Sequence, residues 1–318
     1  MKLSRRAFLS GLGGVALANS HGRLMRAAAQ STLKLGVIND EITQDFDHAL
    51  TVARELGVQF IELRQMWNKN LMDLSEDQVR EARRLLKKYG IRVSDIASPF
   101  MKVDAPGFTT DQGQHDTFNA RFGYKEQDQV LERAMHLAKT FETDKIRVFS
   151  FWRIEKPAQL FDQIVSDLKK AVDKAKKQNI KLVLENEHDC NIATAAESVK
   201  LLAAIQDPYF ALNWDPGNAY AAGEKPYPDG YNLLPKNRIL HMHVKDAKRN
   251  PATGKSEWAA MGQGDIDYVG QFKALKRDGY SYAVSLETHW RNEKKNAEES
   301  TRICMQGMKS LIARANLA

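Results

Sequence analysis

Residues 180–215 contain one complete strand–helix–strand repeat, and this stretch decides the fold. It opens with the apolar run Ile180-Lys-Leu-Val-Leu-Glu185 and closes with Phe210-Ala-Leu-Asn-Trp-Asp215. Between the two runs, residues 194–205 have the spacing of an amphipathic helix. Two strands joined by a single helix predict parallel pairing through a right-handed crossover.

The same alternation continues on both sides of this repeat. Further buried strands are predicted at 33–38, 58–63, 91–97, 146–151, 239–245 and 281–287, with helical patterns between them. Eight such units within residues 30–318 favour a closed (β/α)₈ TIM barrel, an α/β fold with a single domain. No Gly-x-Gly-x-x-Gly follows the first strand, which disfavours a dinucleotide-binding sheet.

Residues 1–29 have the features of an export signal. Ser4-Arg-Arg-Ala-Phe-Leu9 places two arginines before a short apolar run, and Ala27-Ala-Ala29 follows. This order is typical of a twin-arginine signal peptide, so we expect cleavage near Ala29 and a periplasmic or otherwise exported protein. The run is too short to span a bilayer and the first 30 residues hold no cysteine, so no stable membrane anchor is expected.

The formal charge of +7 comes mostly from this leader. Five of the 47 lysines and arginines lie in residues 1–30, which hold no acidic residue, leaving 42 basic against 40 acidic residues. A body this close to neutral gives no electrostatic reason to bind nucleic acid. The two cysteines exclude a disulfide framework. No stretch indicates a subunit interface, and whether the chain forms a homo-oligomer stays open.

Polar residues stand where the predicted strands end. In a TIM barrel the active site lies at these carboxyl ends. Glu185, Asp215, His243 and Glu287 end strands five to eight, and Glu62 ends the second strand. Three carboxylates and an imidazole converging on one pocket require a cation, and oxygen and nitrogen donors suit Mn²⁺, Mg²⁺, Co²⁺ or Zn²⁺.

Five segments, in this order, resemble the sugar phosphate isomerase/epimerase family with the xylose isomerase-like barrel. They are Leu184-Glu-Asn-Glu-His188, Trp214-Asp-Pro-Gly-Asn218, His241-Met-His-Val-Lys-Asp246, Gly262-Gln-Gly-Asp-Ile-Asp267 and Leu286-Glu-Thr-His289. The resemblance covers essentially all of residues 30–318. It implies that Glu185, Asp215, His243 and Glu287 bind one divalent metal ion, with Mn²⁺ as the first choice. His241 is expected to lie deeper, beneath the ligands.

The resemblance also implies a mechanism. Glu185 and Glu287, on opposite sides of a sugar, remove and return a proton next to a carbonyl through an enediolate. His188 and Lys245 would hold hydroxyls or the developing oxyanion. Arg153 is a candidate hydroxyl clamp. Asn218 stands where several relatives carry a substrate-contacting histidine, so it joins Glu62 among the candidate substrate-binding residues.

Aromatic residues near the strand ends favour a carbohydrate substrate. Trp152 and Trp258 are the candidates for stacking on a sugar face. Export and the lack of a phosphate-binding loop favour an unphosphorylated ketose or related sugar over a sugar phosphate.

Two alternatives remain at this point. The same site could act as a lyase that cleaves 3-keto-glycosides by β-elimination, which release of an aglycone would reveal. A non-catalytic sugar-binding protein would keep sugar affinity in Glu185→Gln and form no product. A DNA-repair endonuclease on this barrel is disfavoured because Leu63-Arg-Gln65 and Ser98-Pro-Phe100 lack the extra histidines which that chemistry requires.

Overall fold

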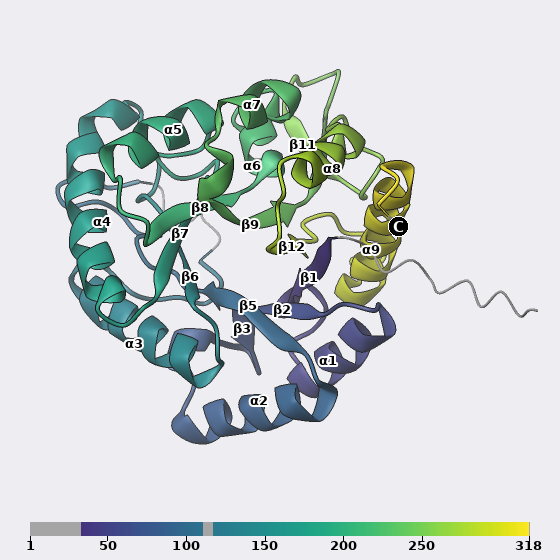
Figure 1. The fold of residues 1–318 in the computed structure, drawn as a ribbon, viewed down its shortest axis with the longest axis horizontal. Helices are drawn as coiled ribbons and strands as arrows, with labels where there is room; N and C mark the ends of the chain where they lie inside the picture. The colour runs from purple at the N-terminus through teal and green to yellow at the C-terminus, as the bar shows by residue number, and fades with distance from the viewer. Residues whose placement is uncertain (1–32, 111–116, 318) are drawn as a thin grey trace, which may run out of the picture. The chain divides into compact units, whose positions relative to one another are not determined.

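The computed structural model describes residues 33–110 and 117–317. Eight parallel strands close into a barrel in the spatial order β1-β12-β9-β8-β7-β6-β5-β2, which confirms the predicted fold class. Figure 1 shows them at the centre of a ring of helices. The strands are β1 (Lys34–Ile38), β2 (Phe60–Leu63), β5 (Arg92–Ala97), β6 (Lys145–Val148), β7 (Lys181–Glu185), β8 (Phe210–Trp214), β9 (Ile239–Val244) and β12 (Ala283–Leu286). The predicted signal at 1–29 and its boundary lie outside the described residues.

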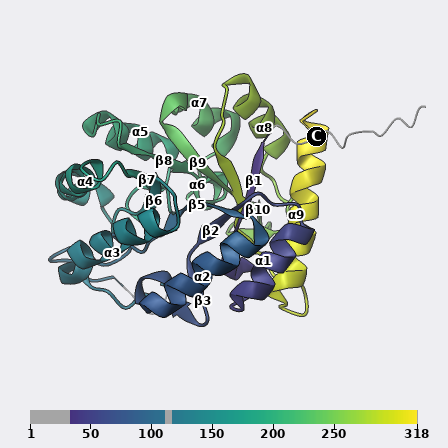
Figure 2. The same ribbon diagram turned by 60° about the horizontal axis from the view of Figure 1, so that its bottom comes forward.

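The helices begin and end where the sequence carries capping signals. Ser75 caps α2 through a capping box and Gly90 ends it at φ 65°, a left-handed conformation that glycine adopts without strain. Figure 2 shows the last helix, α9, beside α1, where Arg302 pairs with Glu55 at 2.6 Å. The helices are α1 (Phe46–Glu55), α2 (Glu76–Tyr89), α3 (Gln127–Thr140), α4 (Phe161–Lys176), α5 (Ala195–Ala204), α6 (Pro216–Ala221), α7 (Tyr231–Leu233), α8 (Tyr268–Arg277) and α9 (Ala297–Arg314).

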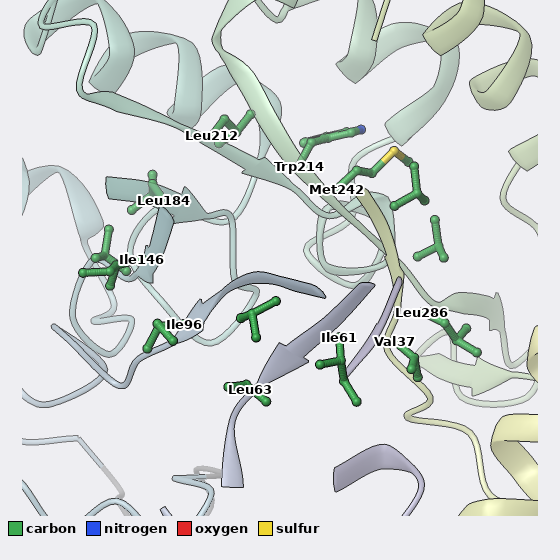
Figure 3. Close-up of a cluster of buried hydrophobic side chains, with 14 of the residues drawn as sticks. Val37, Ile61, Leu63, Ile96, Ile146, Leu184, Leu212, Trp214, Met242 and Leu286 are labelled. Carbon is green, nitrogen blue, oxygen red and sulfur yellow. The ribbon is translucent and has the colours of Figure 1, made fainter. Parts of the chain in front are cut away.

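The apolar core lies between the strands and the helices. Figure 3 shows part of it: Val37, Ile61, Leu63, Ile96, Ile146, Leu184, Leu212, Trp214, Met242 and Leu286. Trp214 was expected in this layer, and its indole Nε1 donates to Gln271 Oε1 of α8 at 3.3 Å.

The other face of the same strands is polar. Residues that alternate with the apolar set are buried and hydrophilic: Glu62, Asp95, Arg147, Glu185, Asn213, His241, His243 and Ser285. Because successive strand residues point to opposite faces, these side chains fill the barrel interior. TIM-barrel interiors are usually packed with branched apolar residues, so this interior points to chemistry as well as packing.

One segment predicted as loop contains a hairpin. β10 (Asp246–Arg249) pairs antiparallel with β11 (Ser256–Ala259), and β11 carries Trp258. A smaller hairpin joins β3 (Gln65–Met66) and β4 (Lys69–Asn70) after β2. Among the described residues, no helix has an apolar stretch long enough to cross a bilayer.

Candidate active site

The structure brings four predicted residues together at the carboxyl ends of neighbouring strands. One side-chain donor atom from each of Glu185, Asp215, His243 and Glu287 lies within 4.8 Å of the others. All four side chains are buried. Their elements are adjacent in the barrel order, from β7 through β8 and β9 to β12. We refer to these four residues as the carboxylate–histidine cluster.

The Asp-Pro-Gly-Asn turn aims Asp215 into this cluster. Asp215 is the N-cap of α6, and its Oδ1 accepts from the backbone N–H of Asn218 at 2.8 Å. Capping occupies that oxygen and leaves Oδ2 facing His243 at 3.7 Å. Gly217 lets the backbone come close, because a Cβ there would meet Lys245 Cγ at 2.5 Å.

A second buried carboxylate orients His243. Its Nε2 lies 2.8 Å from Glu62 Oε2, while its Nδ1 faces Glu185 Oε1 at 3.3 Å and Glu287 Oε2 at 3.5 Å. A proton on Nε2, donated to Glu62, leaves the Nδ1 lone pair directed into the cluster. Burial acts to lower the pKa of His243, but the surrounding carboxylates raise it well above its usual value.

Glu62 was expected among the substrate-binding residues, and that role stays a prediction. Its side chain is fully buried and contacts His243, His241 and Arg147, which favours a role in orienting His243. Position at a strand end cannot separate the two roles, because it does not fix how deep a side chain lies in the barrel.

Lys245 reaches into the cluster. Its ammonium Nζ lies 2.5 Å from Glu287 Oε2 and 3.0 Å from Asp215 Oδ2, with the side chain 2% exposed. Although burial acts in the opposite direction, Lys245 and the neighbouring imidazoles hold the pKa of Glu287 well below its usual range. Lys245 is therefore placed where it can contact an oxygen bound beside Glu287.

Two further cations in this region were missed by sequence reasoning. The Arg147 guanidinium, from β6, lies 3.2 Å from Glu185 Oε2 and 3.3 Å from Glu62 Oε1. Arg64, directly after β2, donates to Glu287 Oε1 at 3.0 Å. The available signal for Arg147 was its place between the apolar residues Ile146 and Val148 of a predicted strand, since a buried arginine requires carboxylate partners.

The donor set fits a divalent metal ion. Glu185 Oε2 and Asp215 Oδ2 are buried and accept no hydrogen bond from any described residue, although each lies within ion-pair distance of a cation. Buried carboxylate oxygens without hydrogen bonds are costly unless a cation satisfies them. Three carboxylates and one imidazole without a thiolate are ligands that hard or borderline divalent ions accept.

His188, Asn218 and Trp258 lie around the cluster. Asn218 Nδ2 donates to Glu185 Oε1 at 3.1 Å, and its Oδ1 accepts from His188 Nδ1 at 2.9 Å. The Trp258 ring lies 5.7 Å from the His188 ring and 5.3 Å from Lys245 Nζ. These contacts put all three within reach of a ligand bound to the cluster.

His188 is held by Glu187. The His188 Nδ1 lies 2.7 Å from Glu187 Oε1. Burial acts to lower the pKa of His188, but the Glu187 carboxylate prevails and raises it to about 9.

Arg153 and Trp152 have other partners. Arg153 pairs with Glu197 Oε1 at 2.9 Å and donates to two backbone carbonyls, those of Cys190 and Asn191. Trp152 is 2% exposed and packs against Phe149 and Cys190. Both therefore stabilise the loops after β6 and β7. The proposed contact of Arg153 with a substrate hydroxyl stays a prediction.

His241 lies below the cluster, as expected. Its Nε2 contacts Ser285 Oγ at 2.9 Å and Glu62 Oε2 at 3.4 Å, and its Nδ1 faces Asp95 at 3.5 Å. It supports Glu62, which in turn holds His243.

Comparison with known proteins identifies the family and the fold. Residues 50–310 match the family model described as xylose isomerase-like TIM barrel. No curated protein matches this chain.

Three solved structures with similar folds carry informative names. The IolI protein with a bound zinc atom has a TM-score of 0.68 at 17% identity, covering 89% of this chain and 99% of its own. D-allulose 3-epimerase from Methylomonas sp. has a TM-score of 0.66 at 16% identity, covering 90% and 99%. The probable 3-DHS dehydratase AsbF from Bacillus anthracis has a TM-score of 0.66 at 19% identity, covering 88% and 98%. Because the family model matches most of its length, this chain belongs to the xylose isomerase-like TIM barrel family.

Proposed function

We propose that the chain is a divalent-metal-dependent sugar isomerase or epimerase acting on an unphosphorylated ketose or related sugar. The observation that carries the proposal is the carboxylate–histidine cluster, whose donor atoms lie within 4.8 Å of one another. Glu185, Asp215, His243 and Glu287 would hold the ion, for which we propose Mn²⁺, with Mg²⁺, Co²⁺ and Zn²⁺ as alternatives. When bound, the ion supplies Lewis acidity toward a carbonyl and its neighbouring hydroxyl.

The protein's own groups supply the proton transfer. Glu185 and Glu287 are the cluster's outermost members in the barrel order and serve as the bases that remove and return a proton at the carbon next to the carbonyl. Asn218 fixes Glu185 by donating to Oε1 at 3.1 Å. Lys245, 2.5 Å from Glu287, provides a positive charge for the oxyanion of the resulting enediolate.

The comparisons support this class of reaction without defining it. One structural neighbour is named as an epimerase of D-allulose and another is named with a bound zinc atom. A third is named as a dehydratase, which favours keeping elimination as a second candidate.

That second candidate is a lyase that cleaves 3-keto-glycosides, and one observation favours it. His188 lies at the edge of the cluster with its side chain 30% exposed and a pKa raised to about 9. A protonated imidazole there can donate to a leaving-group oxygen, which epimerisation does not need.

Product analysis separates the two candidates. Metal-stripped protein is reloaded with each of the four ions and incubated with free ketoses and with a 3-keto-glycoside, and products are followed by NMR. An isomer with an intact carbon skeleton supports the isomerase or epimerase, while a released aglycone supports the lyase. Equal product in chelated and reloaded samples contradicts both.

We also propose that residues 1–29 direct export through the twin-arginine pathway. The pattern Ser4-Arg-Arg-Ala-Phe-Leu9 supports this proposal. Replacing Arg5 and Arg6 by lysine keeps the charge, so loss of the protein from the periplasmic fraction would support a requirement for paired arginines. Unchanged fractionation would contradict it.

A further inference from the structure

A polar pocket lies beside the carboxylate–histidine cluster. Its volume is about 340 Å³, within the size class of small-ligand sites, and its lining includes Asp40, Glu41, Gln65, Asn119 and Arg291. We call it the Glu287-side pocket. None of these five residues has a part in the proposed reaction.

The pocket is connected to Glu287 through two of its lining residues. Arg64 and His289 also line it, and both contact Glu287 Oε1, with Arg64 Nη1 at 3.0 Å and His289 Nε2 at 3.3 Å. The His289 Nε2 is buried and has no hydrogen-bond partner among the described residues. A molecule over the cluster could therefore extend into the pocket past Glu287.

The charges in the pocket compensate one another. Arg64 binds Asp40 Oδ1 at 3.0 Å and Glu41 Oε1 at 2.7 Å, and Arg291 binds Glu41 Oε2 at 2.9 Å. Among the described lining residues, both guanidiniums are thus paired with carboxylates, and the His289 imidazole faces Glu287 Oε1 at 3.3 Å, so no lysine or arginine there is unpaired. The lining favours a neutral ligand.

The remaining groups suit a ring rich in hydroxyls. Asn119 Nδ2 donates to Gln65 Oε1 at 2.7 Å, and Gln65 Nε2 donates to Asp40 Oδ2 at 2.7 Å. Amides and carboxylates side by side can both donate to and accept from hydroxyls. Phe118 adds an apolar wall, since its ring centroid lies 3.8 Å from Arg64 Cζ, and aromatic faces pack against the C–H surfaces of sugars.

We propose that the Glu287-side pocket is a second sugar subsite, so that the substrate has two units: one ring over the cluster and a neutral second unit in this pocket. The inference rests on the proposed function and adds the size of the substrate to it. It predicts a preference for disaccharides or glycosides over single sugars.

Binding measurements test the subsite independently of turnover. Metal-loaded protein is titrated with methyl glucoside, methyl galactoside, cellobiose, lactose, sucrose and trehalose by ligand-observed NMR and calorimetry. The test variant combines Gln65→Ala with Asn119→Gly, because Asn119 has φ 60° and glycine accepts that conformation. The matched control is Asn179→Gly, also at positive φ (58°) but before β7, at the opposite end of the barrel.

The subsite predicts that at least one two-unit sugar binds about tenfold more tightly than its one-unit component. The double variant should remove that gain and the Asn179→Gly control should keep it. A panel in which no two-unit sugar gains affinity overturns the subsite, as does a gain that survives the double variant.

Exchange of substrate C–H protons with D₂O, measured in the same samples, distinguishes failure of the subsite from failure of the proposed function. If metal-dependent exchange occurs on one-unit ketoses while no two-unit sugar gains affinity, the subsite fails and the proposed function stands. If the gain in affinity is present and no sugar or keto-glycoside shows exchange, the proposed function fails and the pocket remains a sugar-binding site.

Discussion

Replacing Glu62 by glutamine should weaken metal binding by about tenfold. The Glu62 Oε2 accepts from His243 Nε2 at 2.8 Å, and both side chains are fully buried. Glutamine keeps the shape and an acceptor oxygen but loses the charge. A hydrogen bond to a charged group contributes about 1.5–3 kcal/mol and a neutral one about 0.5–1.5 kcal/mol.

The difference, about 1–2 kcal/mol, corresponds to roughly 5–30-fold in Kd. Substitutions of groups that orient metal-binding histidines typically weaken metal affinity by about 10–100-fold. The two ranges overlap near a factor of ten. Glu62 should therefore act through the orientation of the imidazole, without touching the ion.

The assay is calorimetric titration of metal-stripped protein with Mn²⁺ at about pH 8, which limits competition from protons on the ligands. Asp95→Asn is the matched control: Asp95 is also fully buried and faces His241 Nδ1 at 3.5 Å rather than His243. A Kd that is unchanged in Glu62→Gln, or that weakens equally in Asp95→Asn, would refute this reasoning.

Three other substitutions test the surroundings of the site and the opposite end of the barrel, where Asp144 precedes β6. Gly217→Ala places a Cβ 2.7 Å from the carbonyl oxygen of Lys245 and should cost about 1–3 kcal/mol of unfolding free energy, measured in urea. Arg147→Met leaves two buried glutamates without their shared cation and should cost about 3–5 kcal/mol, so a loss below about 1 kcal/mol would contradict the ion-pair network. Burial acts to raise the pKa of Asp144, but hydrogen bonds from Lys145 and Lys181 lower it to about 2. The contribution of this carboxylate to folding stability is therefore present above its ordinary pKa near 3.8 and is lost as the pH falls toward 2. Since this side chain is 45% exposed, Asp144→Asn should cost only about 1 kcal/mol at neutral pH and nothing below pH 2, and an equal cost at both pH values would contradict the assignment.

The alternation of apolar strands and amphipathic helices predicts the barrel because each repeat has its own local signals. Ser75 and Gly90, for example, delimit α2 as expected. The hairpin that carries Trp258 was missed because Asp246–Arg249 and Ser256–Ala259 lack a regular apolar alternation, and their pairing lies outside the barrel.

The gathering of Glu185, Asp215, His243 and Glu287 was predictable because parallel strands bring their carboxyl ends to one mouth. How deep each side chain lies in the barrel could not be predicted from the sequence. Glu62 and Arg147 lie below the mouth, where Arg147 Nη1 is 3.3 Å from Glu62 Oε1. A sequence pattern shows which residues of one strand share a face. The ion pair between Glu62 and Arg147 joins strands that are far apart in the chain, so no local pattern predicts it.

Deuterium incorporation tests the central claim most directly: that the carboxylate–histidine cluster performs metal-dependent proton transfer. Wild type, Glu185→Gln and a control, Glu55→Gln, are reloaded with Mn²⁺ and incubated in D₂O with ketoses and a 3-keto-glycoside. Glu55 pairs with Arg302 between α1 and α9, away from the cluster. The account predicts exchange at the carbon next to the carbonyl in wild type, reduced about 10²–10⁴-fold in Glu185→Gln, abolished by chelation, and retained in Glu55→Gln. Exchange that persists at the wild-type rate in Glu185→Gln, or after chelation, would contradict it.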